Sequence, residues 1–127
     1  MSDRDIMVLS TLQEIAESIR LIRRRFVSIH SSDDFLADEE GLTKLDGISM
    51  RLIAIGEAFK NIDKHTDKTL LNQFPQVDWK GVKGIRDILS HHYFDLDADT
   101  IFWICEEDIP LLEETVEEMM VFWEAHP

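Results

Sequence analysis

Helical periodicity is the strongest pattern in this sequence, and it limits the fold to one built from helices. Apolar residues recur at steps of three and four positions from Ile6 to Phe26 and again from Leu42 to Ile62. This spacing places apolar side chains along one face of an α-helix, and no stretch of the chain shows an equally clear strand pattern. Two long helices are therefore predicted, the first of them capped by Asp3 or Asp5.

The second long helix, predicted from about Asp38 to Lys64, contains Gly47 and Gly56. A glycine inside a helix costs about 1 kcal/mol relative to alanine, so each is expected to allow another element to approach closely. Glu57 follows the second glycine; it is expected to be solvated, with an interface carboxylate as the alternative. The polar segment 28–40 is predicted to be a solvated loop, since its acidic residues lack the spacing of a calcium-binding loop.

Shorter apolar stripes predict further helices in the C-terminal half. Asp78 is a good N-cap for a third helix, and a last helical region is expected to begin near residue 98. Pro110 has no amide proton to continue a helix, so a break or kink is expected near Asp108. The stripes together predict an all-α bundle of four or five helices, in one domain spanning residues 1–127.

The chain is strongly acidic, with a formal net charge of −13. This balance argues against broad, sequence-blind binding to nucleic-acid backbones, while leaving room for a local basic cleft. Residues 95–127 hold eleven Asp and Glu and no Lys or Arg, so the basic residues all lie in the first two thirds. The arginines near residues 20–25 either match the negative end of a helix dipole or form a phosphate-contacting patch.

Cys105 is the only cysteine, which rules out an internal disulfide and a cysteine-based zinc site. Its apolar neighbours predict a small, buried hydrophobic side chain. The first residues do not resemble a signal peptide, and no stretch approaches the roughly 18 to 20 apolar residues of a membrane span. We therefore expect a soluble cytoplasmic protein with no metal site, no cofactor and no membrane association.

An arginine, two histidines and the only tyrosine fall within residues 84–93. Arg86, His91 and Tyr93 form an R-x-x-x-x-H-x-Y pattern with the chemistry to act on a phosphodiester. Arginine binds a phosphate through paired hydrogen bonds, and histidine transfers protons near neutral pH. Attack by an RNA 2′-hydroxyl on its neighbouring phosphate needs both functions and no metal ion.

Helical geometry qualifies this pattern. At about 100° per residue, Arg86 and Tyr93 lie on nearly the same face, whereas Arg86 and His91 point roughly 140° apart. Either the helix loosens near His91, or the site is completed across a dimer interface. The alternative interpretation is an ordinary helix end, in which His91 and His92 favour the helix dipole and Tyr93 is half-buried.

Three separated motifs, in order, resemble the HepT-like branch of the HEPN superfamily. The resemblance covers roughly residues 40–115. Its motifs are Ile55–Ala58, the signature region from Pro75–Trp79 through Arg86–Asp97, and Thr100–Trp103 followed by Asp108–Leu112.

The resemblance implies a helical-bundle toxin of a toxin–antitoxin pair that acts as a metal-independent ribonuclease. Such proteins form homodimers in which the R-x-x-x-x-H motifs of both chains line a shared cleft. Their partner is a minimal nucleotidyltransferase antitoxin, which in some pairs transfers AMP to the motif tyrosine and silences the toxin. The alternative that it leaves open is an inactive nucleotide-binding or interaction module of a nucleotidyltransferase complex.

Carried over by position, the resemblance gives each residue of the motif a role. Arg86 would bind the phosphate, His91 would be the acid/base residue, and Tyr93 would accept AMP. Asp87 would support the site by orienting Arg86 or the histidine. For the RNA substrate of such a protein, the basic residues outside the acidic C-terminal segment supply the further candidate contacts, namely Arg20, Arg24 and Lys83.

Overall fold

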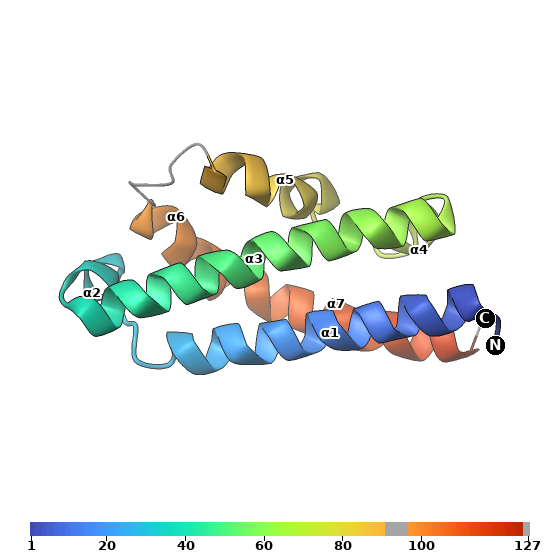
Figure 1. Cartoon of the computed structure of the whole chain (residues 1–127), viewed down its shortest axis with the longest axis horizontal. Helices are drawn as coiled ribbons and strands as arrows, with labels where there is room; N and C mark the ends of the chain where they lie inside the picture. The colour runs from blue at the N-terminus through green and yellow to red at the C-terminus, as the bar shows by residue number, and fades with distance from the viewer. Residues whose placement is uncertain (91–96, 126–127) are drawn as a thin grey trace.

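The computed structural model of the chain describes residues 1–90 and 97–125. Its framework is four helices, and Figure 1 shows α3 lying between α1 and α5 while α7 packs along α1. These helices are α1 (Asp3–Phe26), α3 (Glu39–Thr66), α5 (Trp79–Ser90) and α7 (Ile109–Ala125). The described part of the chain contains no strand, and the predicted all-α fold is confirmed.

Four short elements complete the described fold. They are α2 (Ser32–Leu36), α4 (Thr69–Asn72), α6 (Ala98–Trp103) and the π-helix η1 (Ile104–Asp108). Within the described residues, no helix combines the length and the apolar character that crossing a membrane requires.

The N-terminus of α1 differs from the prediction. Ser2, not Asp3 or Asp5, is the N-cap: its Oγ accepts a hydrogen bond from the Asp5 amide at 3.1 Å. The Asp5 carboxylate accepts one from the Ser2 amide in return, also at 3.1 Å. This reciprocal pair is a capping box, which places the acidic residue inside the first turn instead of at the cap.

The two predicted stripes form the centre of the core. Ile15 and Ile19 of α1 and Ile48 and Phe59 of α3 are almost completely buried. The first residues of the stripes, Ile6 and Leu42, are exposed, at 54% and 43%. Trp123 links α7 to the first turn of α1, because its Nε1 donates a hydrogen bond to the Asp5 carbonyl at 2.9 Å.

The segment predicted as a solvated loop, residues 28–40, contains α2. Phe35 of this short helix is fully buried, and that burial gives a five-residue helix its support. Gly41 lets the segment pack closely, because a Cβ there would lie only 2.3 Å from the Asp34 carbonyl oxygen. Asp38 caps α3 by accepting a hydrogen bond from the Gly41 amide at 2.7 Å.

Pro110 does not break the chain's helical course. Of the predicted break or kink near Asp108, the break is wrong, because η1 ends at Asp108 and α7 follows directly at Ile109; the helix departs from α-helical geometry over η1, next to the predicted position. A π-helical turn widens the helix by one residue, and such turns accommodate a residue that cannot donate the usual hydrogen bond.

Candidate active site

α5 carries the start of the predicted site. Asp78 caps it as predicted, accepting a hydrogen bond from the Gly81 amide at 3.1 Å. The Trp79 ring packs on Phe59 of α3 with centroids 4.8 Å apart, and its Nε1 donates to the Phe74 carbonyl at 2.9 Å. These contacts anchor the first turn of α5 on the core.

α3 and α5 approach each other closely at Gly56. A Cβ on this residue would lie 2.7 Å from the Val82 carbonyl oxygen and 3.1 Å from Cγ2 of Ile85, so only glycine fits without a shift. The close approach predicted for Gly56 is therefore confirmed. Gly47 differs, because its Cβ would meet only the Arg25 side chain, at an ordinary 3.6 Å.

This close packing sets Arg86 against α3. Ile85 and Leu89 face the core, so Arg86 lies on the outer face of α5 with its side chain 58% exposed. Its Nη1 donates to Oε1 of Glu57 at 3.3 Å, and Lys60 Nζ donates to the same oxygen at 3.4 Å. The guanidinium is therefore held at the surface by a carboxylate of the neighbouring helix.

The electrostatics of Glu57 follow from these contacts. Partial desolvation pushes the pKa of Glu57 upward, but the hydrogen bonds and charges of Arg86 and Lys60 outweigh it. The net effect holds the pKa of Glu57 below its ordinary value. The carboxylate therefore remains ionised and paired with Arg86 at neutral pH.

The sequence gives Glu57 no role in the candidate site. It is expected to be solvated, with an interface carboxylate as the alternative; its side chain is 41% exposed and pairs with Arg86 across the contact of α3 with α5, which agrees with the alternative. The available signal was the neighbouring Gly56, because a glycine inside a helix indicates close packing of another element at that level.

The structure describes only part of the rest of the predicted motif. His91, His92 and Tyr93 lie outside the described residues, so their places relative to Arg86 stay predictions. Asp87 is exposed, and among the described residues it has no hydrogen-bond or ion-pair partner. Its supporting role also stays a prediction.

The three predicted RNA contacts do not form one surface. Arg20 and Arg24 belong to α1 and Lys83 to α5, on opposite sides of α3 (Figure 1). Arg20 pairs with Glu17 through two hydrogen bonds of 2.9 and 2.6 Å. Lys83 forms an ion pair with Asp63 of α3.

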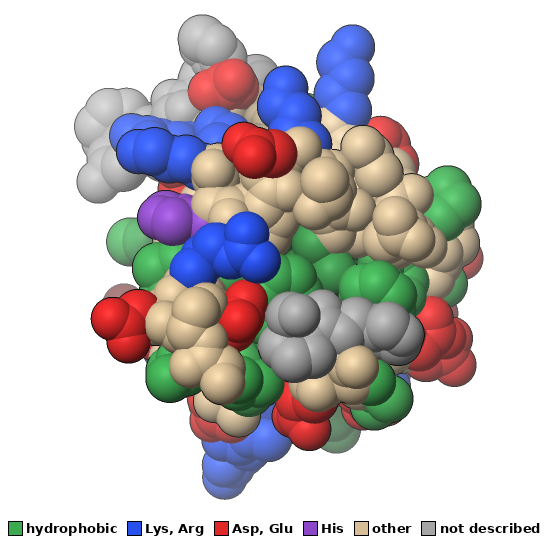
Figure 2. Space-filling view, turned by 90° about the vertical axis from the view of Figure 1, so that its right-hand side faces the viewer, with side chains coloured by type: hydrophobic (Ala, Val, Ile, Leu, Met, Phe, Trp, Pro, Cys, Tyr) green, Lys and Arg blue, Asp and Glu red, His purple; other side chains and the backbone are tan. Residues whose placement is uncertain are grey.

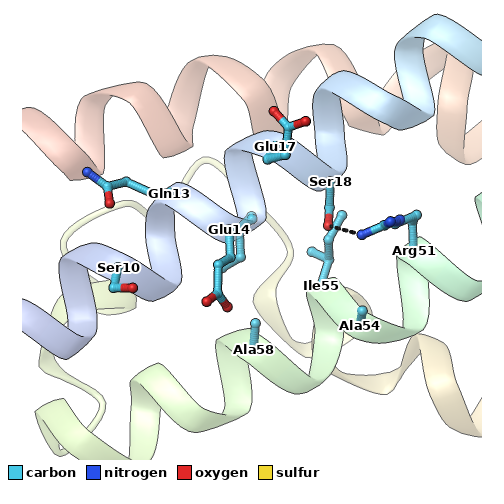
Figure 3. Close-up of a pocket in the computed structure, with 10 residues that line it drawn as sticks. Ser10, Gln13, Glu14, Glu17, Ser18, Arg51, Ala54, Ile55 and Ala58 are labelled. Carbon is cyan, nitrogen blue, oxygen red and sulfur yellow. Dashed lines mark hydrogen bonds between the residues drawn. The ribbon is translucent and has the colours of Figure 1, made fainter.

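A groove of about 490 Å³ separates α1 from α3 on the side away from α5. Arg51 points into it and donates to Ser18 Oγ at 3.4 Å (Figure 3). Glu14 and Glu17 line the same groove, so its charge is mixed. The lining of this groove therefore offers no excess of positive charge to a polyanion.

Cys105 is buried, as predicted, and burial raises the pKa of its thiol to about 12. A thiol with such a pKa is a poor nucleophile near neutral pH. Across residues 1–90 and 97–125, no three His, Cys, Asp or Glu side chains are grouped to hold a metal ion.

Comparison with known proteins identifies a family of ribonucleases with sequences similar to this chain. The model of a family described as "Ribonuclease HepT-like" matches residues 15–119. A Thermococcus cleftensis protein named "Probable ribonuclease HepT" is 33% identical over 108 residues, 85% of this chain and 91% of the relative. A Methanocaldococcus jannaschii protein named "Putative RNase MJ0127" is 33% identical over 95 residues, 75% of this chain and 73% of the relative.

A third relative extends the same relation. A Caldanaerobacter subterraneus protein named "Putative RNase TTE0752" is 32% identical over 109 residues, covering 86% of this chain and 90% of the relative. No solved structure gives a significant match. The family model spans both helices that meet at Gly56 and all of the R-x-x-x-x-H-x-Y pattern, and on this evidence the chain belongs to the HepT-like ribonuclease family of the HEPN superfamily.

Proposed function

We propose that this chain is the toxin of a toxin–antitoxin pair and cleaves RNA without a metal ion. The observation that carries the proposal is the exposed Arg86 guanidinium, held on the outer face of α5 in a chain that belongs to the HepT-like ribonuclease family. Relatives named as ribonucleases cover most of the chain and support the same assignment.

The proposed chemistry is attack within the RNA chain. A 2′-hydroxyl attacks the adjacent phosphorus, and His91 removes its proton as the new P–O bond forms. The bond to the 5′-oxygen breaks, and that oxygen takes a proton from a second acid. The products are a 2′,3′-cyclic phosphate and a 5′-hydroxyl. Arg86 binds the phosphate oxygens, on which negative charge grows in the transition state.

A homodimer supplies what one chain lacks in this reaction. A single histidine cannot accept and donate a proton in the same step, whereas two copies of His91 can divide the roles. Helical geometry supports the same arrangement, because Arg86 and His91 point roughly 140° apart on an ideal helix. We therefore assign the active site to a cleft that two chains share.

Glu57 gives Arg86 a defined resting position. Its carboxylate is an anion held where Arg86 will later bind a phosphate, with the two side chains 3.3 Å apart. Binding of RNA then exchanges one anionic partner of Arg86 for another. The carboxylate keeps the guanidinium at the surface of α5 between catalytic events.

We further propose that a minimal nucleotidyltransferase antitoxin silences the chain by modifying Tyr93. The tyrosine oxygen attacks the α-phosphorus of ATP, a new P–O bond forms, and pyrophosphate leaves. The AMP group brings a negative phosphodiester to the helix face of Arg86, because residues seven apart lie on nearly the same side. That phosphate competes directly with the phosphate of the RNA substrate.

The decisive experiment measures RNA cleavage by the purified protein in EDTA. Wild-type protein is expected to cleave RNA, and both Arg86→Ala and His91→Ala are expected to abolish cleavage and growth inhibition. Lys44→Gln, which removes a charge near the start of α3, serves as the control and is expected to retain activity. Full activity in both motif variants would contradict the proposal.

The second candidate is a catalytically inactive nucleotide-binding or interaction module of a nucleotidyltransferase complex. The net charge of −13 favours the interaction module, because a strongly acidic chain repels polyanions such as RNA. Intact-mass measurement after incubation with the partner and ATP separates the candidates. Addition of AMP to Tyr93 in a chain that cleaves RNA supports the toxin, whereas a tight, unmodified complex of a chain without RNase activity supports the module.

A further inference from the structure

Four of the chain's six lysines gather at one end of the molecule. Together with Asp63 they line a hollow of about 390 Å³ where the C-terminal end of α3 meets α5. Figure 2 shows this end, with Lys and Arg side chains gathered in the upper part of the view. The lysine cluster consists of Lys60, Lys64, Lys68 and Lys83.

Two lysines of the cluster have acidic partners among the residues that the structure describes. Lys83 pairs with Asp63, and Lys60 pairs with Glu57. Lys64 and Lys68 are exposed and form no ion pair with any residue that the structure describes. Glu57 is also shared with Arg86, so the described cations of this region outnumber the carboxylates that pair with them, in a chain whose net charge is −13.

Asp63 organises the cluster from beneath. Its side chain is only 9% exposed, and its Oδ1 has no hydrogen-bond partner among the described residues. A buried carboxylate with an unpaired oxygen is costly unless nearby cations stabilise its charge. The lysines supply that charge, and Asp63 in turn holds Lys83 over the hollow.

The turn after α3 brings Lys68 into the cluster. Asp67 and Lys68 both adopt left-handed backbone conformations, with φ of 50° and 63°. For residues other than glycine such conformations cost roughly 1 kcal/mol each or more. The Lys68 amide donates to the Asp63 carbonyl at 2.9 Å, which closes the turn. A glycine would relieve the strain at position 68, but it would remove the charge from the hollow.

The cluster adjoins the candidate active site. Lys83 lies three residues before Arg86 on α5, and Lys60 lies three residues after Glu57 on α3, one turn in each case. Glu57 contacts both Arg86 and Lys60, so it links the site to the cluster. From Glu57 to Lys64 the distance along the axis of α3 is about 10 Å.

We infer that the lysine cluster binds the phosphodiester backbone of single-stranded RNA beside the cleavage site, with Lys64 and Lys68 as the principal contacts. This inference rests on the proposed ribonuclease function for the identity of the polyanion. Lysine ammonium groups are point charges on flexible stems, which suits contact with successive phosphates without selection of bases. The cluster extends substrate binding from Arg86 along the junction of α3 and α5.

The primary test uses a fluorescent 2′-O-methyl oligouridylate, which keeps the backbone charge but lacks the nucleophilic hydroxyl. Lys64→Gln/Lys68→Gln is expected to bind it about 25-fold more weakly at 0.1 M salt, given a slope of about −0.7 per phosphate contact on a single strand. The salt slope is expected to decrease in magnitude by about 1.4 for the two lost contacts. Unchanged affinity and slope would overturn the inference.

Two control variants separate charge from folding. Lys64→Arg/Lys68→Arg keeps both charges and is expected to retain the affinity and the salt slope. Lys44→Gln removes one charge at the other end of α3 and is expected to bind like wild type. If Lys44→Gln weakens binding as much as Lys64→Gln alone, net charge explains the effect and the lysine cluster does not.

Cleavage of unmodified RNA distinguishes failure of this inference from failure of the proposed function. For Lys64→Gln/Lys68→Gln, KM is expected to rise about as much as the affinity falls, while kcat stays near the wild-type value. If the wild-type protein cleaves RNA and the double variant has an unchanged KM, RNA binding by the lysine cluster is refuted and the ribonuclease function stands. If binding depends on the lysines but the wild-type protein does not cleave RNA, RNA binding by the lysine cluster is supported and the ribonuclease function is refuted.

ATP is the other source of phosphate groups in the proposed system. A parallel titration with ATP is expected to show little dependence on Lys64 and Lys68. If the double substitution weakens binding of ATP and leaves binding of the oligonucleotide unchanged, the hollow is a nucleotide site and the RNA assignment is wrong.

Discussion

The two sides of α3 carry basic residues in different surroundings. On the α1 side, Arg20 pairs with Glu17, and Arg51 lies in a groove that Glu14 also lines. On the α5 side, Arg86 shares one carboxylate with Lys60, and two further lysines have no acidic partner among the described residues. A carboxylate beside a cation offsets its charge, so the surroundings of each cation, as well as the number of cations, bear on where a polyanion can bind.

The two glycines of α3 also differ in how closely another element packs against them. Gly56 faces α5, where a Cβ would lie 2.7 Å from a backbone oxygen. Gly47 faces the flexible Arg25 side chain at 3.6 Å. The α5 side is thus held by a backbone contact that cannot adjust, and this contact sets the position of Arg86.

The strongest test compares RNA cleavage by variants of Arg86, on the α5 side, and Arg20, on the α1 side. Arg86→Lys keeps the charge but loses the paired hydrogen bonds to a phosphate, so we expect RNA cleavage to fall roughly 100-fold. Arg20→Lys keeps the charge on the α1 side and is expected to lower cleavage less than twofold. Single-turnover cleavage rates measure both. Equal losses in the two variants would show that both sides of α3 act on the substrate.

The two glycines provide a matched pair for stability. We expect Gly56→Ala to destabilise the protein by about 1–3 kcal/mol, because its methyl group must push α5 away from α3. Gly47→Ala is expected to be neutral or to stabilise the protein by up to about 1 kcal/mol, since alanine favours the helix. Urea unfolding measures both free energies. A stabilising Gly56→Ala would disprove the close approach at that position.

The smallest expected effect concerns the Glu57–Arg86 ion pair. Because the pKa of Glu57 is lowered in the folded protein, the pair stabilises the fold fully above the unfolded pKa of Glu. That stabilisation is lost as the pH falls through the lowered, folded pKa. Glu57→Gln is therefore expected to lose a small part of the stability at neutral pH and to flatten the stability profile in the acid range. Thermal unfolding across this pH range measures the difference, and parallel profiles would refute the pairing.

Local rules were sufficient for several parts of the fold. The apolar stripes located α1 and α3, and Asp78 was recognisable as a cap, since its carboxylate accepts the amide three residues ahead. Local rules failed where packing decided the outcome. The polar segment 28–40 contains the short helix α2, which is supported by the buried Phe35 side chain. The helix also continues from η1 into α7 without a break at Pro110.

The helical class of this protein, its family, and the residue types suited to a phosphodiester can be inferred from the amino-acid sequence. These follow from patterns along the chain, since periodicity, caps and the R-x-x-x-x-H-x-Y spacing all depend on neighbouring residues. The pairing of Glu57 with Arg86, and the gathering of Lys83 with Lys64 and Lys68 over Asp63, cannot be inferred in this way. These partners lie about 15 to 29 residues apart in the sequence, and the packing of α3 against α5 at Gly56 brings them together.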